Sequence, residues 1–156
     1  MRIHIYFDNI QNKFPVGFQL KALMRRTVAA TLKYEGIKNK TEVSITFADD
    51  AEIQKLNAEY RNLDRPTDVL SFPIEDDVDA ADNGQVLMLG DIVISLERAA
   101  AQAEEFGHGL KREVAFLCAH SMLHLLGYDH ELGEEQDADM RRRQREIMKL
   151  MRLEVK

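Results

Sequence analysis

The sequence predicts an α/β (α+β) fold in which a small, mixed, four-stranded sheet packs against about five helices. Four segments have the alternation or the β-branched and aromatic composition of strands, and five have apolar residues at helical spacing. The chain also begins with a strand, a helix and a second strand, an order that implies a parallel pair joined by a right-handed crossover. Its 156 residues, of which 45% are hydrophobic, are enough for one domain over residues 1–156.

The first part of the chain supplies the parallel pair. Apolar and polar residues alternate from Ile3 to Phe7, as in a half-buried strand, and again from Val43 to Phe47. Between them, Phe18–Tyr34 has helical spacing and is followed by Gly36, where a helix stop is expected. Next come a short helix capped by Asp49 or Asp50 and ending near Tyr60, and a polar loop over residues 61–67.

The rest of the chain predicts a hairpin and three more helices. Val69–Pro73 and Val86–Ser95 have the composition of strands and are close enough in sequence to pair as a long hairpin. The acidic residues between them, with Asn83-Gly84, indicate an exposed connection. The helices are Leu96–Phe106, closed by Gly107, then Leu110–Leu126, closed by Gly127, and finally Glu131 to about Leu153.

Composition and charge exclude several classes of protein. No apolar run approaches the about 20 residues that span a bilayer, so no membrane partner is expected. A single cysteine, Cys118, rules out an internal disulfide and favours a reducing, cytoplasmic location. The net charge of −6 argues against a protein that coats nucleic acid with its whole surface. A local basic cleft is still compatible with it, because acidic residues dominate 75–95 whereas Arg and Lys dominate 141–156.

Three of the five histidines lie within eleven residues, at His120, His124 and His130. Residues i and i+4 of a helix are neighbours, so two imidazoles there can bind one metal at the usual Zn–N distance of about 2.0–2.1 Å. Gly127 can end the helix, and the chain then turns back so that the third imidazole reaches the same point. Three protein ligands leave a fourth position open, as in catalytic zinc sites. The spacing therefore predicts one divalent metal per chain.

The same spacing occurs in a long zinc-peptidase pattern, with one difference. That pattern needs a glutamate directly after the first histidine, as the general base on metal-bound water. This sequence has Ser121 there, and a hydroxyl is not a base at neutral pH. The difference argues against a peptide substrate and leaves another hydrolysis open.

Three stretches together resemble the YbeY family, the bacterial endoribonucleases of ribosomal RNA maturation. The segment from His120 to His130 resembles the family signature, and two more stretches agree in order and spacing. The resemblance covers nearly the whole chain and is poorest over residues 75–88 and at the C-terminal tail. The additional stretches are Asn57–Arg61 followed by Thr67–Pro73, and Leu89–Ile92.

The resemblance implies a metal-dependent, single-strand-specific endoribonuclease that acts in 16S ribosomal RNA 3′-end maturation and in ribosome quality control. It implies RNA, namely the 16S precursor and the ribosome, as partner and Zn²⁺ as cofactor. The family's metal histidines map onto His120, His124 and His130, and its functionally important arginine maps onto Arg61. The alternatives are a metal hydrolase of another, non-peptide substrate and a ribosome-assembly factor whose metal is structural.

Several residues are open to two interpretations. Asp91 and Asp129 are candidates for orienting an imidazole, although we favour a turn role for Asp129. Asp68 is either a site residue or a turn or strand-start residue. Without the family resemblance, we would prefer a surface ion pair as the role of Arg61. The basic run in 141–156 either matches the dipole of the last helix or contacts RNA.

Overall fold

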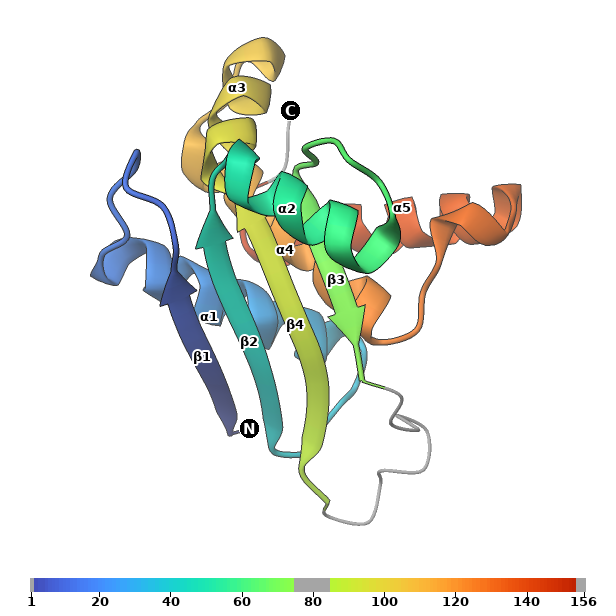
Figure 1. The fold of residues 1–156 in the computed structure, drawn as a ribbon. Coiled ribbons are helices and arrows are strands. Elements are labelled where there is room, and N and C mark those ends of the chain that lie inside the picture. Colours follow the sequence, from blue (N-terminus) through green and yellow to red (C-terminus); the bar gives the residue numbers. More distant parts are fainter. Residues whose placement is uncertain (1, 75–84, 154–156) are drawn as a thin grey trace.

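The computed structural model describes residues 2–74 and 85–153 and confirms the α/β fold class (Figure 1). Four strands form one mixed sheet, in the order β1-β2-β4-β3. The strands are β1 (Ile3–Asn9), β2 (Thr41–Ala48), β3 (Val69–Pro73) and β4 (Leu87–Ser95). The helices are α1 (Phe18–Tyr34), α2 (Asp50–Arg61), α3 (Leu96–Phe106), α4 (Leu110–Leu125) and α5 (Glu134–Leu150), with a short 3₁₀ helix at His130–Leu132.

The pairing of the strands contains both predicted motifs. β1 and β2 are parallel, as the crossover requires, and β3 is antiparallel to β4, as in a hairpin. β4 is also parallel to β2, which places it between β2 and β3 and leaves β3 at the edge of the sheet. The predicted acidic connection at 75–84 lies outside the described residues.

The helices form two layers around the sheet (Figure 1). α1 and α4 lie behind it, in the view of Figure 1, and contribute most of the core; α2 crosses in front of the ends of β4 and β3. α4 lies deepest, since ten of its residues are buried. Burial on nearly all sides fixes this helix firmly and therefore fixes any side chain that projects from its C-terminal end.

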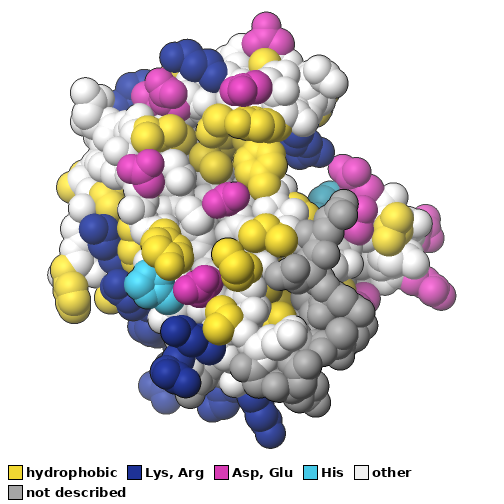
Figure 2. Space-filling model, turned by 60° about the horizontal axis from the view of Figure 1, so that its bottom comes forward, with side chains coloured by type: hydrophobic (Ala, Val, Ile, Leu, Met, Phe, Trp, Pro, Cys, Tyr) yellow, Lys and Arg dark blue, Asp and Glu magenta, His cyan; other side chains and the backbone are white. Residues whose placement is uncertain are grey.

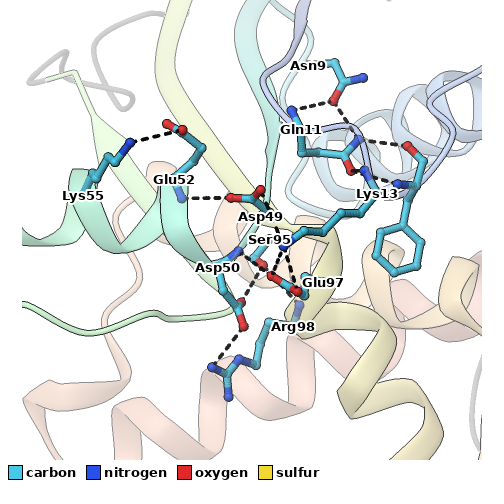
Figure 3. Close-up of polar contacts among 11 residues, drawn as sticks. Asn9, Gln11, Lys13, Asp49, Asp50, Glu52, Lys55, Ser95, Glu97 and Arg98 are labelled. Carbon is cyan, nitrogen blue, oxygen red and sulfur yellow. Dashed lines mark hydrogen bonds and ion pairs between the residues drawn. The ribbon is translucent and has the colours of Figure 1, made fainter.

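A polar network fixes α2 at its N-terminus (Figure 3). The cap is Asp49, which accepts a hydrogen bond from the backbone N–H of Glu52 at 2.9 Å. Asp50, the other predicted cap, instead accepts from the hydroxyl of Ser95 at 2.9 Å, and its backbone N–H donates to Glu97 at 3.0 Å. These contacts tie α2 to the junction of β4 and α3, so the opposite end of α2 is held in a defined position.

Gly90 is the residue of β4 that β3 approaches most closely among the described glycines. Its φ of +130° lies in the region that favours glycine, and a Cβ there would approach the backbone oxygen of Phe72 to 2.2 Å. The pairing of β2 with β4 shifts at the same place, because Glu42 faces Met88 but Val43 faces Gly90. The glycine therefore allows β3 to come close to β4.

The prediction of one helix from Glu131 to about Leu153 is wrong at both ends. The chain forms a 3₁₀ turn at His130–Leu132, breaks at Gly133, and only then begins α5, which ends at Leu150. Gly133 has φ of +154°, which a continuous helix does not accommodate. A uniformly polar, helix-favouring sequence hides this break, because only the glycine marks it.

Charge is unevenly distributed over the surface. Figure 2 shows Lys and Arg gathered along the lower edge of one face, with apolar side chains scattered over its centre.

Among the described helices, none is both long enough and apolar enough to cross a bilayer.

Candidate metal centre and cleft

The structure brings the three predicted histidines together. His120 and His124 project from the last turns of α4, one turn apart, and His130 begins the 3₁₀ helix after the bend at Gly127. The ring centroids lie 4.6, 5.4 and 5.1 Å apart. Each ring offers one nitrogen, and these three atoms lie within 4.8 Å of one another. A helical i, i+4 pair followed by a glycine turn is thus sufficient to build the cluster.

The contacts of the ring nitrogens fit a shared metal ion. The Nε2 atoms of His120 and His124 face each other at 3.1 Å, close to the about 3.3 Å expected for two nitrogens tetrahedrally bound at about 2.05 Å. The Nδ1 atom of His130 is buried and has no hydrogen-bond partner among the described residues. The His130 ring also offers one nitrogen within 4.8 Å of a nitrogen from each of the other two rings, so a divalent cation could bind all three histidines.

Burial favours the neutral form of two of the three imidazoles. Burial, with His124 beside it, lowers the pKa of His120 to about 4. Burial and the nearby His130 also lower the pKa of His124, against a hydrogen bond to the Tyr128 backbone. Neutral imidazole is the form that binds metal, so the site is prepared for a cation at neutral pH.

Sequence reasoning missed Gln144, which lies on α5 and contacts the cluster. Its side chain is 4% exposed, and its Nε2 donates to the backbone oxygen of Phe116 at 2.8 Å. Its Oε1 lies 3.3 Å from Nδ1 of His120. One signal in the sequence could have found it: Gln144 is the polar member of an otherwise apolar helical stripe with Met140, Ile147 and Met148.

The cluster opens into a cleft of about 670 Å³. One wall is the end of α4 with the turn that carries His130, and the other is the end of α2 with the edge strand β3. Arg61 lines this cleft together with the three histidines. This position is the one expected if Arg61 belongs to the same site. Within residues 2–74 and 85–153 it makes no ion pair, so the structure gives no support there to the surface ion-pair alternative.

The aspartates with two interpretations differ in their positions. Asp68 lines the cleft and also starts β3, since one carboxylate oxygen accepts from the backbone N–H of Val69 at 2.8 Å. Asp129 lines the cleft and caps the 3₁₀ helix through the N–H of Glu131 at 2.9 Å, which supports its turn role. Asp91 is exposed on β4 and is not among the residues that line the cleft.

Ser121 stands where a zinc peptidase would carry its glutamate. It is fully buried, and its hydroxyl forms a hydrogen bond with the hydroxyl of Ser71 on β3. The contact joins α4 to the edge strand. This position therefore provides a structural link and no base for water.

Fold and site together define a small α/β protein with a candidate three-histidine metal centre in an open cleft. Residues 6–152 match the family model described as Endoribonuclease YbeY. The "Endoribonuclease YbeY" of Pelotomaculum thermopropionicum is 46% identical over 144 residues, which cover 92% of this chain and 94% of that protein. The corresponding Moorella thermoacetica protein is 47% identical over 145 residues, with 90% and 92% covered.

The fold is also similar to that of a solved structure. A Thermotoga maritima protein, determined in solution, superimposes with a TM-score of 0.58 at 26% identity and covers 95% of this chain and 91% of its own. The chain belongs to the YbeY family, whose named members are endoribonucleases.

Proposed function

We propose that this protein is a metal-dependent, single-strand-specific endoribonuclease whose site is the cleft beside the three histidines. The observation that carries the proposal is that Arg61, from α2, shares one cleft with His120, His124 and His130. A cation and a guanidinium in one cleft suit a phosphodiester, because charge develops on the phosphate oxygens during cleavage. Membership of a family of named endoribonucleases supports the same reaction.

In this proposal the three histidines hold the metal, with Zn²⁺ as the expected ion. When bound, it would supply a Lewis acid for a phosphate oxygen and would lower the pKa of bound water. Arg61 binds a phosphate oxygen pair through its two-pronged guanidinium, which orients the phosphate without transferring a proton.

The charge of the cleft explains why RNA binding would need the metal. Three carboxylates line the described cleft, those of Asp68, Asp129 and Glu131, against the single guanidinium of Arg61. With neutral histidines this lining carries about two negative charges, which repel a phosphate backbone. A divalent cation balances them, so metal removal should weaken RNA binding as well as catalysis.

The biological setting of the proposal follows the family resemblance. The substrate is the precursor of 16S ribosomal RNA, cleaved during 3′-end maturation and in ribosome quality control, and the partner is the ribosome in the cytoplasm. No peptide substrate is expected, since Ser121 replaces the peptidase base.

The test compares cleavage of single-stranded and duplex RNA by metal-stripped, zinc-restored and His120→Ala proteins, each beside a thermal melt. We expect cleavage of the single strand only, restored by zinc, and abolished in a still-folded His120→Ala protein. His4→Ala is the matched control, because His4 is exposed on β1, away from the cleft. Normal cleavage by His120→Ala would overturn the assignment. A metal that raises the melting temperature without enabling cleavage would instead support the assembly-factor alternative.

A further inference from the structure

Tyr60 is an exposed aromatic residue that lines the cleft. It lies in the last turn of α2, directly before Arg61, and is 62% exposed. Its ring packs against that of Phe72 on β3, with centroids 5.4 Å apart and planes at 65°. Both rings line the same cleft as the three histidines. The far wall of the cleft is therefore an aromatic pair next to the candidate phosphate-binding residue.

The fold does not need the Tyr60 ring for its core. Phe72 packs against the small cluster formed by Ala48, Ile53, Leu70 and Val93, whereas Tyr60 belongs to neither core cluster of the described residues. An edge-on contact with Phe72 fixes the position of the Tyr60 ring and still leaves it more than half open to solvent. The pair therefore presents a supported, solvent-exposed aromatic ring.

We propose that Tyr60, supported by Phe72, is a stacking subsite for one unpaired base of the RNA whose neighbouring phosphate is bound by Arg61. The inference rests on the proposed function. Every nucleobase has a π-face, so an aromatic ring binds bases with little sequence preference. A base inside a duplex already has its faces covered by its neighbours, and only an unpaired base can stack on the protein. The platform thus gives the enzyme its selectivity for single strands.

The neighbouring charge favours RNA over a protein partner as the occupant. Arg61 follows Tyr60 directly and has no ion pair within the described chain, so a phosphate can reach it while the adjacent base reaches the ring. A nucleotide presents this combination of an anion and a flat apolar face within one unit.

The experiment uses zinc-loaded protein and short single-stranded RNAs that carry 2-aminopurine or an abasic nucleotide at each position in turn. We expect Tyr60→Ala to raise KM for the intact strand by about 5- to 150-fold, which corresponds to about 1–3 kcal/mol of stacking, with less change in kcat. Tyr60→Phe retains the ring and should retain the quenching of 2-aminopurine fluorescence. Tyr6→Ala is the matched control, because Tyr6 is 53% exposed but lies on β1 and does not line the cleft.

The decisive result is the coupling between base and ring. At one position an abasic nucleotide should raise KM for the unaltered protein and have little effect on Tyr60→Ala. Independent effects of the two changes, or normal KM and quenching in Tyr60→Ala, overturn the subsite, and a protein contact would then become the better role for Tyr60. Failure of the proposed function looks different, since the unaltered protein would then cleave no single-stranded RNA. Fluorescence quenching is read without cleavage and still decides whether the ring binds a base.

Discussion

The side-chain oxygen of Gln144 lies 3.3 Å from Nδ1 of His120, and its side-chain nitrogen donates to the backbone oxygen of Phe116 at 2.8 Å. The second contact decides the orientation of the amide, because a carbonyl oxygen accepts only from the NH₂ end. The oxygen end therefore faces His120, whose Nδ1 carries the proton. The lone pair of Nε2 is left to point toward the other histidines, as a metal ligand must.

The first prediction is that Gln144→Leu weakens zinc binding by about 10- to 100-fold, the usual effect of losing a hydrogen bond to a metal-binding histidine. Leucine has a similar size and keeps the site apolar, so the fold should survive. Titration with zinc against a competing chelator measures the affinity. Arg145→Leu is the control, since Arg145 is the next residue of α5 and is exposed. Unchanged zinc affinity in a folded Gln144→Leu protein would show that His120 needs no such partner.

The sequence predicts the local contacts of the metal centre better than the contacts that come from distant segments of the chain. His120, His124 and His130 are brought together by a helical turn and a glycine bend, which are local and visible as spacing. Gln144 reaches His120 only because α5 packs on α4, and no spacing rule gives that contact. Arg61 is intermediate: its inclusion in the site came from family resemblance, and its distance of about sixty residues in sequence is closed by the packing of α2.

The second prediction concerns Arg61. Removing the guanidinium in Arg61→Ala should lower kcat/KM for RNA by about 10- to 150-fold, equivalent to the about 1.5–3 kcal/mol of a hydrogen bond to a charged group, with zinc content unchanged. Arg61→Lys should recover only part of the activity, because an ammonium makes no two-pronged contact with phosphate. Arg65→Ala is the matched control, being exposed nearby but outside the cleft lining. Full activity in Arg61→Ala would remove Arg61 from the site.

The third prediction concerns Gly90 in β4. Gly90→Ala should destabilise the protein by about 1–3 kcal/mol or more, because the residue has φ of +130° and the new Cβ would meet the backbone oxygen of Phe72. A shift of β3 to relieve the clash would also displace the cleft wall and lower RNA cleavage. Denaturant unfolding measures the stability. Met88→Ala on the same strand is 50% exposed and should change it by no more than about 0.5 kcal/mol.

Gly90 also illustrates which parts of the fold the sequence leaves undetermined. Alternation predicts strands and their faces, and the crossover rule predicts that β1 and β2 are parallel. Neither rule says that β4 inserts between β2 and β3, because strand order depends on contacts between distant segments. The sequence also does not reveal the break at Gly133. A single glycine in a polar segment is a weak signal for a helix end when the residues around it favour a helix.

The fourth prediction follows from the low pKa of His120, which burial lowers to about 4. In the unfolded chain the pKa returns to near 6.5, so as pH falls below about 6.5 the unfolded state takes up a proton that the folded state refuses. The metal-free protein should therefore lose about 1–2 kcal/mol between pH 7 and pH 5, above the range where carboxylates titrate. Chemical denaturation at the two pH values measures the loss. His120→Asn lacks the titrating group and should lose less; an equal loss would assign the effect elsewhere.

The fifth prediction concerns Arg143, which holds the turn that carries His130. Its guanidinium lies 4.6 Å from the centre of the Tyr128 ring and pairs with Glu35 at 2.7 Å and with Asp139 at 3.0 Å. Tyr128 is two residues before His130 and lines the cleft, so a stacked guanidinium restricts where the third imidazole can lie.

Arg143→Ala should therefore weaken zinc binding as well as stability. The loss of stability should be about 1.5–3 kcal/mol, because the Glu35 side chain is only 7% exposed and loses its charged partner. Zinc affinity must be measured well below the melting temperature, so that a looser turn is distinguished from an unfolded protein. Arg142→Ala is the matched control: Arg142 also pairs with Asp139, at 2.6 Å, but is half exposed and is not among the cations that stack on an aromatic ring in the described part of the chain. Equal zinc affinity in the two folded variants would mean that His130 holds its position without Arg143.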